Sequence, residues 1–146
     1  MDMTAFALEA KSIATKRSHV KQAFDKLIEK MSEFVKDVQD TLPPISSSPL
    51  STQIDDEGYR KWDVVLTYVS VSDGYFRIDE VLSLCERGEW LEATVHTDYR
   101  PSVREIREIA PKIPDAVAEI LQKLRERGRE AEEGIKTIEE LLAKLQ

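Results

Sequence analysis

A heptad pattern near the C-terminal end of the chain constrains the fold more than any other feature. Its spacing alternates between four and three residues. The positions are Val117, Leu121, Leu124, Gly128, Ala131, Ile135, Ile138, Leu142 and Leu145. A 3.5-residue repeat keeps one narrow apolar seam facing a partner helix, as knobs-into-holes packing requires. A similar seam lies near the other end, at Val20, Phe24, Leu27, Met31, Phe34 and Val38. The sequence therefore predicts two long helices, each packed along a partner helix.

The bounds of the helices follow from proline and capping signals. The first long helix is expected over residues 4–42, because Pro43 and Pro44 end it. Residues 43–58 are rich in Ser, Pro, Asp and Gly, which predicts a flexible loop. Ser102 and Glu105 have the spacing of a capping box, so residues 101–146 are expected to form a short helix followed by the long heptad helix.

Residues 59–100 have the composition of a three-stranded antiparallel β-meander. Asp73-Gly74 and Arg87-Gly88 are two-residue hairpin signals. Turns at these positions set Val69 opposite Ile78 and Leu84 opposite Leu91, and both place their apolar residues on one shared face. That face would contain Val65, Val69, Val71, Phe76, Ile78, Leu82, Leu84, Leu91, Ala93 and Val95. An alternative interpretation makes residues 79–87 a short helix.

These elements predict one α+β domain over residues 1–146, in the order α-β-β-β-α-α. We expect the two long helices to pair within the chain as an antiparallel coiled-coil stalk that flanks the meander. Bulky Phe24 and Met31 would then fill the space beside Gly128 and Ala131. Glycine is also less favourable than alanine in a helix by about 1 kcal/mol. A second interpretation is therefore that Gly128 and Gly134 mark a flexible or bent point of the last helix. A parallel pairing of the last helix with its own copy is the other arrangement of the seam.

Charge and composition exclude several classes of function. The net charge is −7, and residues 51–100 carry five basic and eleven acidic side chains, a balance that disfavours nucleic-acid binding. One cysteine, Cys85, and two histidines provide neither a disulfide nor a Cys/His metal cluster. Because no long uncharged apolar run or signal peptide is visible, we expect a cytoplasmic protein with no membrane contact and no cofactor.

The second face of the predicted sheet is also apolar. It contains Trp62, Leu66, Tyr68 and Trp90, and only one short helix remains to cover it. An isolated sheet with apolar groups on both sides usually buries both. The sequence therefore predicts a homodimer or a higher homo-oligomer, with these four residues at the interface.

One polar constellation lies on the same predicted face. Tyr68, Asp79 and His96 fall in one cross-strand row, where the aspartate could orient the imidazole as a base and the tyrosine could act as an acid. No nucleophile at a strained turn and no Gly-rich phosphate loop accompanies them. A structural cross-strand network is therefore the favoured interpretation.

Three functions follow from these observations. The leading hypothesis is a non-catalytic oligomeric scaffold or adaptor that acts through coiled-coil and sheet-face contacts with an unknown protein partner. The second is a small-ligand binder or enzyme that uses Tyr68, Asp79 and His96. The order of elements also resembles that of prefoldin subunits, which join two coiled-coil helices through β-hairpins and assemble into a clamp-like chaperone. That resemblance implies the third function, a clamp that grips partners at the open ends of the stalks.

Overall fold

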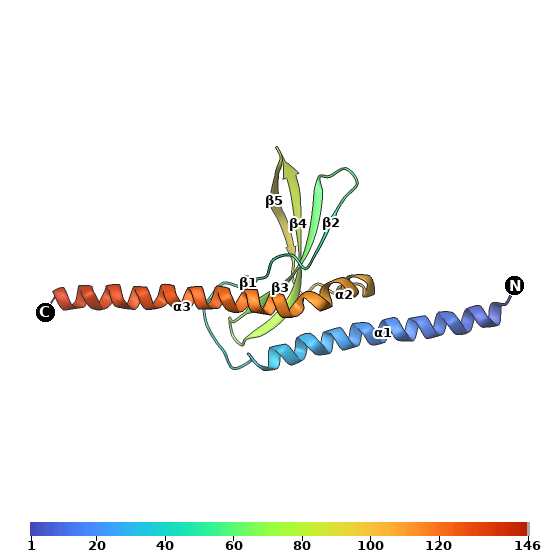
Figure 1. Ribbon diagram of the computed structural model, residues 1–146, viewed down its shortest axis with the longest axis horizontal. Helices are drawn as coiled ribbons and strands as arrows, with labels where there is room; N and C mark the ends of the chain where they lie inside the picture. Colours follow the sequence, from blue (N-terminus) through green and yellow to red (C-terminus); the bar gives the residue numbers. More distant parts are fainter. Residues whose placement is uncertain (146) are drawn as a thin grey trace.

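The computed structural model describes residues 1–145 and combines long helices with one antiparallel sheet, which confirms the α+β class (Figure 1). The helices are α1 (Met3–Glu33), α2 (Val103–Ile109), the short 3-10 helix η1 (Ala110–Lys112) and α3 (Ile113–Lys144). The strands are β1 (Ile45–Ser46), β2 (Ser51–Ile54), β3 (Arg60–Val69), β4 (Tyr75–Glu86) and β5 (Glu89–His96).

Helix α1 ends at Glu33 rather than near Leu42, because its last turn is tied to the sheet. The Ser32 hydroxyl donates to the Ile28 carbonyl and accepts from the Phe76 backbone N–H at 3.0 Å. Beyond Glu33 the chain follows the loop that joins β3 to β4, and the Asp40 N–H donates to the Ser70 carbonyl at 2.9 Å. Contact with the sheet therefore ends the helix before the prolines do.

The sheet is wider than the predicted meander. Residues 43–58, expected to be a flexible loop, instead contribute β1 and β2, which pair antiparallel with β3 one after the other along its outer edge. Strands β3, β4 and β5 follow in order across the sheet. Ile45 and Leu50 are each 4% exposed and hold this edge in the core. Pro49 lies in the gap between the two short strands, where it interrupts no sheet hydrogen bond.

The pairing of β3 with β4 differs from the expected register by three residues. Val69 lies opposite Tyr75 and Leu66 opposite Ile78, because residues 70–74 form a longer connection in which Ser72 has a positive φ of 77°. An odd shift turns every side chain of β3 to the other face. The core residues of β3 are consequently Val64, Leu66 and Tyr68, whereas the predicted shared face contains Val65 and Val69.

The pairing of β4 with β5 agrees with the expected register near its turn only. Leu84 lies opposite Leu91, as predicted, but a β-bulge follows between Leu82 and Ser83. The bulge moves the remaining pairs by one residue, so Glu80 lies opposite His96. The alternative of a short helix over residues 79–87 is wrong, because β4 continues to Glu86.

A hydrophobic core joins the helices to one face of the sheet. α1 packs on β4 and α2, while the first turns of α3 pack on β3 and β1. Its buried members come from every layer: Phe24, Ile45, Leu50, Val64, Leu66, Tyr68, Ile78, Ile106, Ile109, Ile113, Ala116 and Ile120. These residues fix the middle of the molecule, from which both long helices extend.

The two long helices leave the sheet in opposite directions. Figure 1 shows the N-terminus of α1 at one end of the longest axis and the C-terminus of α3 at the other. Within residues 1–145, α1 and α3 have no extended contact, so the antiparallel stalk expected within one chain is not formed. The cause is that each helix packs on its own strands and the two overlap only beside the sheet. We call residues 3–20 the α1 arm and residues 121–145 the α3 arm.

Gly74 is required by a close approach between the β3–β4 connection and the end of α1. A Cβ atom at this position would lie 2.0 Å from the Val35 carbonyl oxygen. We expect Gly74→Ala to lower the free energy of unfolding by about 1–3 kcal/mol, as overpacking does. Urea denaturation followed by circular dichroism measures this change. Asp73→Ala, at the exposed neighbouring position, should change it by less than about 0.5 kcal/mol. Equal effects of the two substitutions would contradict the steric explanation.

Candidate functional site

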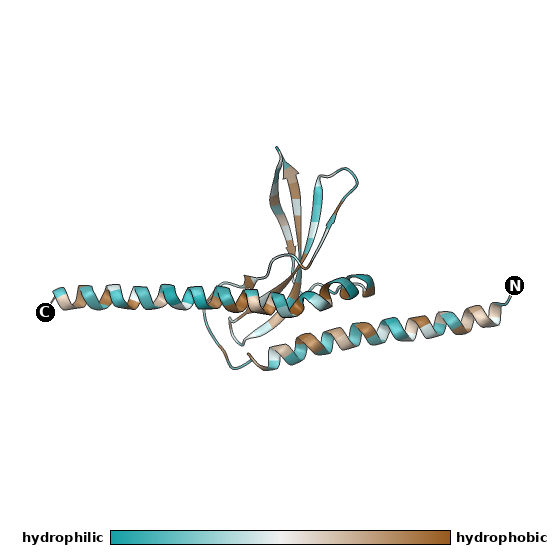
Figure 2. Ribbon diagram, in the orientation of Figure 1, coloured by the Kyte–Doolittle hydropathy of each residue, from teal (hydrophilic) through white to brown (hydrophobic). Residues whose placement is uncertain are grey.

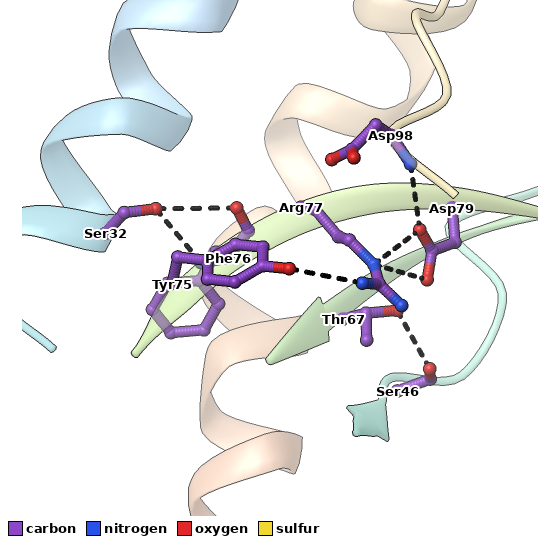
Figure 3. Close-up of polar contacts among 8 residues, drawn as sticks. All are labelled: Ser32, Ser46, Thr67, Tyr75, Phe76, Arg77, Asp79 and Asp98. Atoms are coloured by element: carbon purple, nitrogen blue, oxygen red, sulfur yellow. Dashed lines mark hydrogen bonds and ion pairs between the residues drawn. The ribbon is translucent and has the colours of Figure 1, made fainter. Parts of the chain in front are cut away.

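A polar cluster on β4 joins an arginine, an aspartate and a tyrosine through hydrogen bonds (Figure 3). Tyr75, Arg77 and Asp79 alternate along the strand and therefore share one face. Arg77 Nε donates to both carboxylate oxygens of Asp79, at 2.9 and 3.2 Å. Its Nη1 lies 3.4 Å from the Tyr75 hydroxyl, and the Asp98 backbone N–H donates to Asp79 Oδ1 at 3.2 Å.

The charges of this cluster are mutually compensated. Burial by itself lowers the pKa of Arg77, but the hydrogen bond and negative charge of Asp79 outweigh it and raise that pKa above its ordinary value. Asp79 is 3% exposed, so its carboxylate is directed into the protein rather than toward a substrate. A general base must reach the proton that it removes. The pair is therefore an internal ion pair, not an accessible acid or base.

Neighbouring polar groups complete a structural network. Ser46 Oγ and Thr67 Oγ1 lie 2.9 Å apart and tie β1 to β3, and Ser32 ties α1 to the Phe76 backbone. Among the described residues, every buried side-chain nitrogen and oxygen atom has a hydrogen-bond partner. Fully satisfied networks of this kind specify one arrangement of their elements.

A cleft of about 380 Å³ lies between α1 and the segment that follows β5. Two arginines and two aspartates line it, namely Arg77, Arg100, Asp25 and Asp98, so the cleft has no net charge to select an ion. Its other lining residues are Phe24, Ile28, Phe76, Ile78, Tyr99 and Pro101, which supply no serine, cysteine, lysine or histidine. Burial and the adjacent Glu105 carboxylate, 2.8 Å from the Tyr99 hydroxyl, raise the pKa of Tyr99 far above its ordinary value. The raised pKa keeps the Tyr99 hydroxyl protonated, as the donor in this hydrogen bond.

The three residues of the predicted polar row are not brought together. Tyr68 faces the core, where its ring centroid lies 5.5 Å from that of Phe76. Asp79 lies on the alternate face with Arg77, and His96 Nδ1 lies 3.0 Å from Glu80 Oε1 on an exposed part of β5. The row depended on the two-residue turn at Asp73-Gly74, which the chain does not make. The signal in the sequence for the observed pair is the Arg-x-Asp spacing of Arg77 and Asp79, which places both on one face of a strand.

The four predicted interface residues also separate. Leu66 is fully buried and Tyr68 is 5% exposed, both inside the core of this chain. Trp62 is half-buried, and Trp90 is 36% exposed with Lys61 Nζ 5.0 Å from its ring centroid. Residues on both faces of β3 are buried within one chain. The prediction of a homo-oligomer therefore cannot rest on an uncovered second face of this strand.

Exposed apolar side chains are instead concentrated on the two arms. Figure 2 shows apolar residues recurring along both helices well beyond the sheet. On the α3 arm, the exposed residues are Leu121, Ile135, Ile138, Leu141, Leu142 and Leu145. On the α1 arm they are Met3, Phe6, Leu8, Ile13 and Val20. Past Leu124, every described residue of α3 is exposed. The heptad pattern predicted the α3 seam, but the expected partner was the first long helix of the same chain.

Among residues 1–145, no three His, Cys, Asp or Glu side chains are grouped so that they could hold a metal ion. None of the helices in the same range has the length and apolar character needed to cross a membrane. Comparison of the chain with protein families, curated proteins and solved structures finds no match.

Proposed function

We propose that the protein is a non-catalytic scaffold that assembles with copies of itself through the α3 arm, while the sheet module serves as a docking head. The observation that carries this proposal is the apolar seam, which continues along the arm and is exposed at every seam position from Gly128 to Leu145 among the described residues. The arm is about 37 Å long at 1.5 Å per residue. Most helical stability in proteins comes from packing of an apolar face, so a partner helix would stabilise this arm.

The exposure of the seam supports assembly on energetic grounds. Ile135, Ile138 and Leu142 are 57%, 58% and 55% exposed. Burying such a side chain completely contributes about 1.5–3 kcal/mol. Contiguous apolar surface of this kind marks a contact site in soluble proteins. Pairing two arms would bury all three positions on each helix at once.

The docking head is supported by the open edge of the sheet. Strand β5 pairs only with β4 among the described strands, and each of its residues is exposed. Trp90, Leu91 and Val95 provide apolar side chains along it. An extended segment of a partner can add to such an edge through main-chain hydrogen bonds.

The two alternative functions receive less support from the geometry. An enzyme or small-ligand binder would need Tyr68, Asp79 and His96 to converge, whereas they lie on different faces and at different depths. A prefoldin-like clamp would need two helices that end side by side, whereas the arms point in opposite directions (Figure 1).

Light scattering tests the proposal. We expect the wild-type chain at micromolar concentration to have at least twice its chain mass of 16.7 kDa. Replacing both Ile135 and Ile138 with lysine should return it to the mass of one chain, because charged side chains cannot be buried in the seam. Glu133→Lys, on the opposite side of the same helix, is the matched control and should leave the assembly intact. A monomeric wild-type protein would refute the proposal, as would a double variant that keeps its assembled mass while its sheet remains folded.

A further inference from the structure

We infer that the α3 arm pairs antiparallel with the α3 arm of a second copy, in the register that places Gly128 opposite Ile138 of that copy. This inference rests on the proposed function and specifies its partner and geometry. It follows from the volumes of the seam residues, the length of the free helix and the charges beside the seam.

The volumes of the seam residues favour the antiparallel arrangement. Gly128 and Ala131 are consecutive seam positions, and open space surrounds Gly128 in the single chain. A parallel pair would stack glycine on glycine and then alanine on alanine, which leaves two adjacent layers empty. In the antiparallel register, Ile138 of one copy lies against Gly128 of the other, and Ile135 lies against Ala131. Each layer that contains Gly128 or Ala131 is then filled by an isoleucine of the other copy.

The length of the free helix matches the same register. Ile120 is the last buried residue of α3, and the helix ends at Lys144. The register sets Leu121 against Leu145 and Leu124 against Leu142, so the partner helix ends where the arm leaves its own domain. The pairing therefore covers the exposed seam of the described residues and keeps the two sheet modules at opposite ends.

Charges beside the seam agree with this register. Arg125 and Glu139 both flank the seam on the same side and are exposed. In the antiparallel pair, Arg125 of each copy lies near Glu139 of the other, which gives two favourable ion pairs by symmetry. In a parallel pair, Arg125 lies near Ile120 instead, and Glu139 lies near Gly134. The two arrangements therefore respond differently to a reversal of these charges.

Disulfide crosslinking separates the arrangements directly. In the full chain with Cys85→Ser, two single variants are made, Gly128→Cys and Ile138→Cys. The two copies of residue 128 are about 15 Å apart along the axis of the antiparallel pair, too far for a disulfide. We expect neither variant to crosslink alone under oxidation, and the equilibrated mixture of the two to form a covalent dimer. A parallel pair would crosslink each variant with itself.

Charge reversal supplies an independent measurement. We expect Arg125→Glu to weaken the dimer on the order of tenfold, because two attractive pairs become repulsive. Adding Glu139→Arg should restore the wild-type dissociation constant. Sedimentation equilibrium measures both constants, and the same double change should have no restoring effect in a parallel pair.

The outcomes distinguish this inference from the function on which it rests. A wild-type chain that remains monomeric refutes the proposed function. An assembled protein in which each single-cysteine variant crosslinks with itself overturns the antiparallel register and leaves the scaffold function standing. An assembled protein that crosslinks in neither condition also overturns the register, because the α3 arm then pairs with a different surface, such as the α1 arm of the next copy.

Discussion

Replacing Asp79 with alanine is expected to lower the free energy of unfolding by about 3–5 kcal/mol, the range found when one partner of a buried ion pair is removed. Asp79 is 3% exposed and receives hydrogen bonds from Arg77 Nε and from the Asp98 backbone N–H. Its removal leaves the Arg77 guanidinium, whose side chain is 17% exposed, without a counter-charge. Urea denaturation monitored by tryptophan fluorescence measures the loss.

The matched control removes both charges. In Arg77→Met/Asp79→Leu, no unpaired charge remains, and apolar replacements of a buried pair are often neutral. We therefore expect the double variant to be markedly more stable than Asp79→Ala. A single variant within about 1 kcal/mol of the wild type would mean that water reaches this pair in solution.

Leu66→Ala is expected to lower the free energy of unfolding by about 2–5 kcal/mol, the usual cost of emptying the space of a buried leucine. Leu66 lies at the centre of β3, is fully buried and pairs with Ile78 across the sheet. Because β3 lies between β4 and the two short strands and also packs on α3, the surrounding side chains cannot all move to fill the cavity. The same denaturation experiment measures the change.

Leu91→Ala on β5 is the control for this second substitution. Leu91 is 47% exposed on an edge strand, so its truncation should change stability by about 0.5 kcal/mol or less. The two-residue turn at Asp73-Gly74 would have placed Leu66 outside the core, whereas the predicted shared apolar face contained Leu91. A larger effect at Leu91 than at Leu66 would therefore favour that register over the one in the structure.

Features set by neighbouring residues could be predicted from the sequence. The capping box of α2 is confirmed, since Ser102 Oγ accepts from the Glu105 N–H and the Glu105 carboxylate accepts from the Ser102 N–H. The turn at Arg87-Gly88 is also confirmed, because both residues adopt positive φ and Leu84 lies opposite Leu91. In each case, the residues that determine the backbone geometry lie within the helix end or the turn that they form.

Features set by distant contacts could not be predicted. Gly74 was interpreted as a hairpin residue, whereas it is needed because the Val35 carbonyl packs against it. The β3–β4 connection spans residues 70–74 and is longer than a two-residue turn, and its length decides which side chains of β3 face the core. The predicted polar site depended on the same register, since the observed pairing places Tyr68 in the core and Asp79 on the opposite face of the sheet. Nothing in the spacing of residues 70–74 alone encodes the position of the end of α1.

The opposed directions of the two arms determine how such an assembly would meet its targets. When two copies join through their α3 arms, both α1 arms remain at the outer ends, and each sheet edge is present twice. A target that displays two matching sites would be held by a second contact at high effective concentration once the first had formed. The avidity would then depend on the distance between the sites, which must match the rigid separation of the two heads.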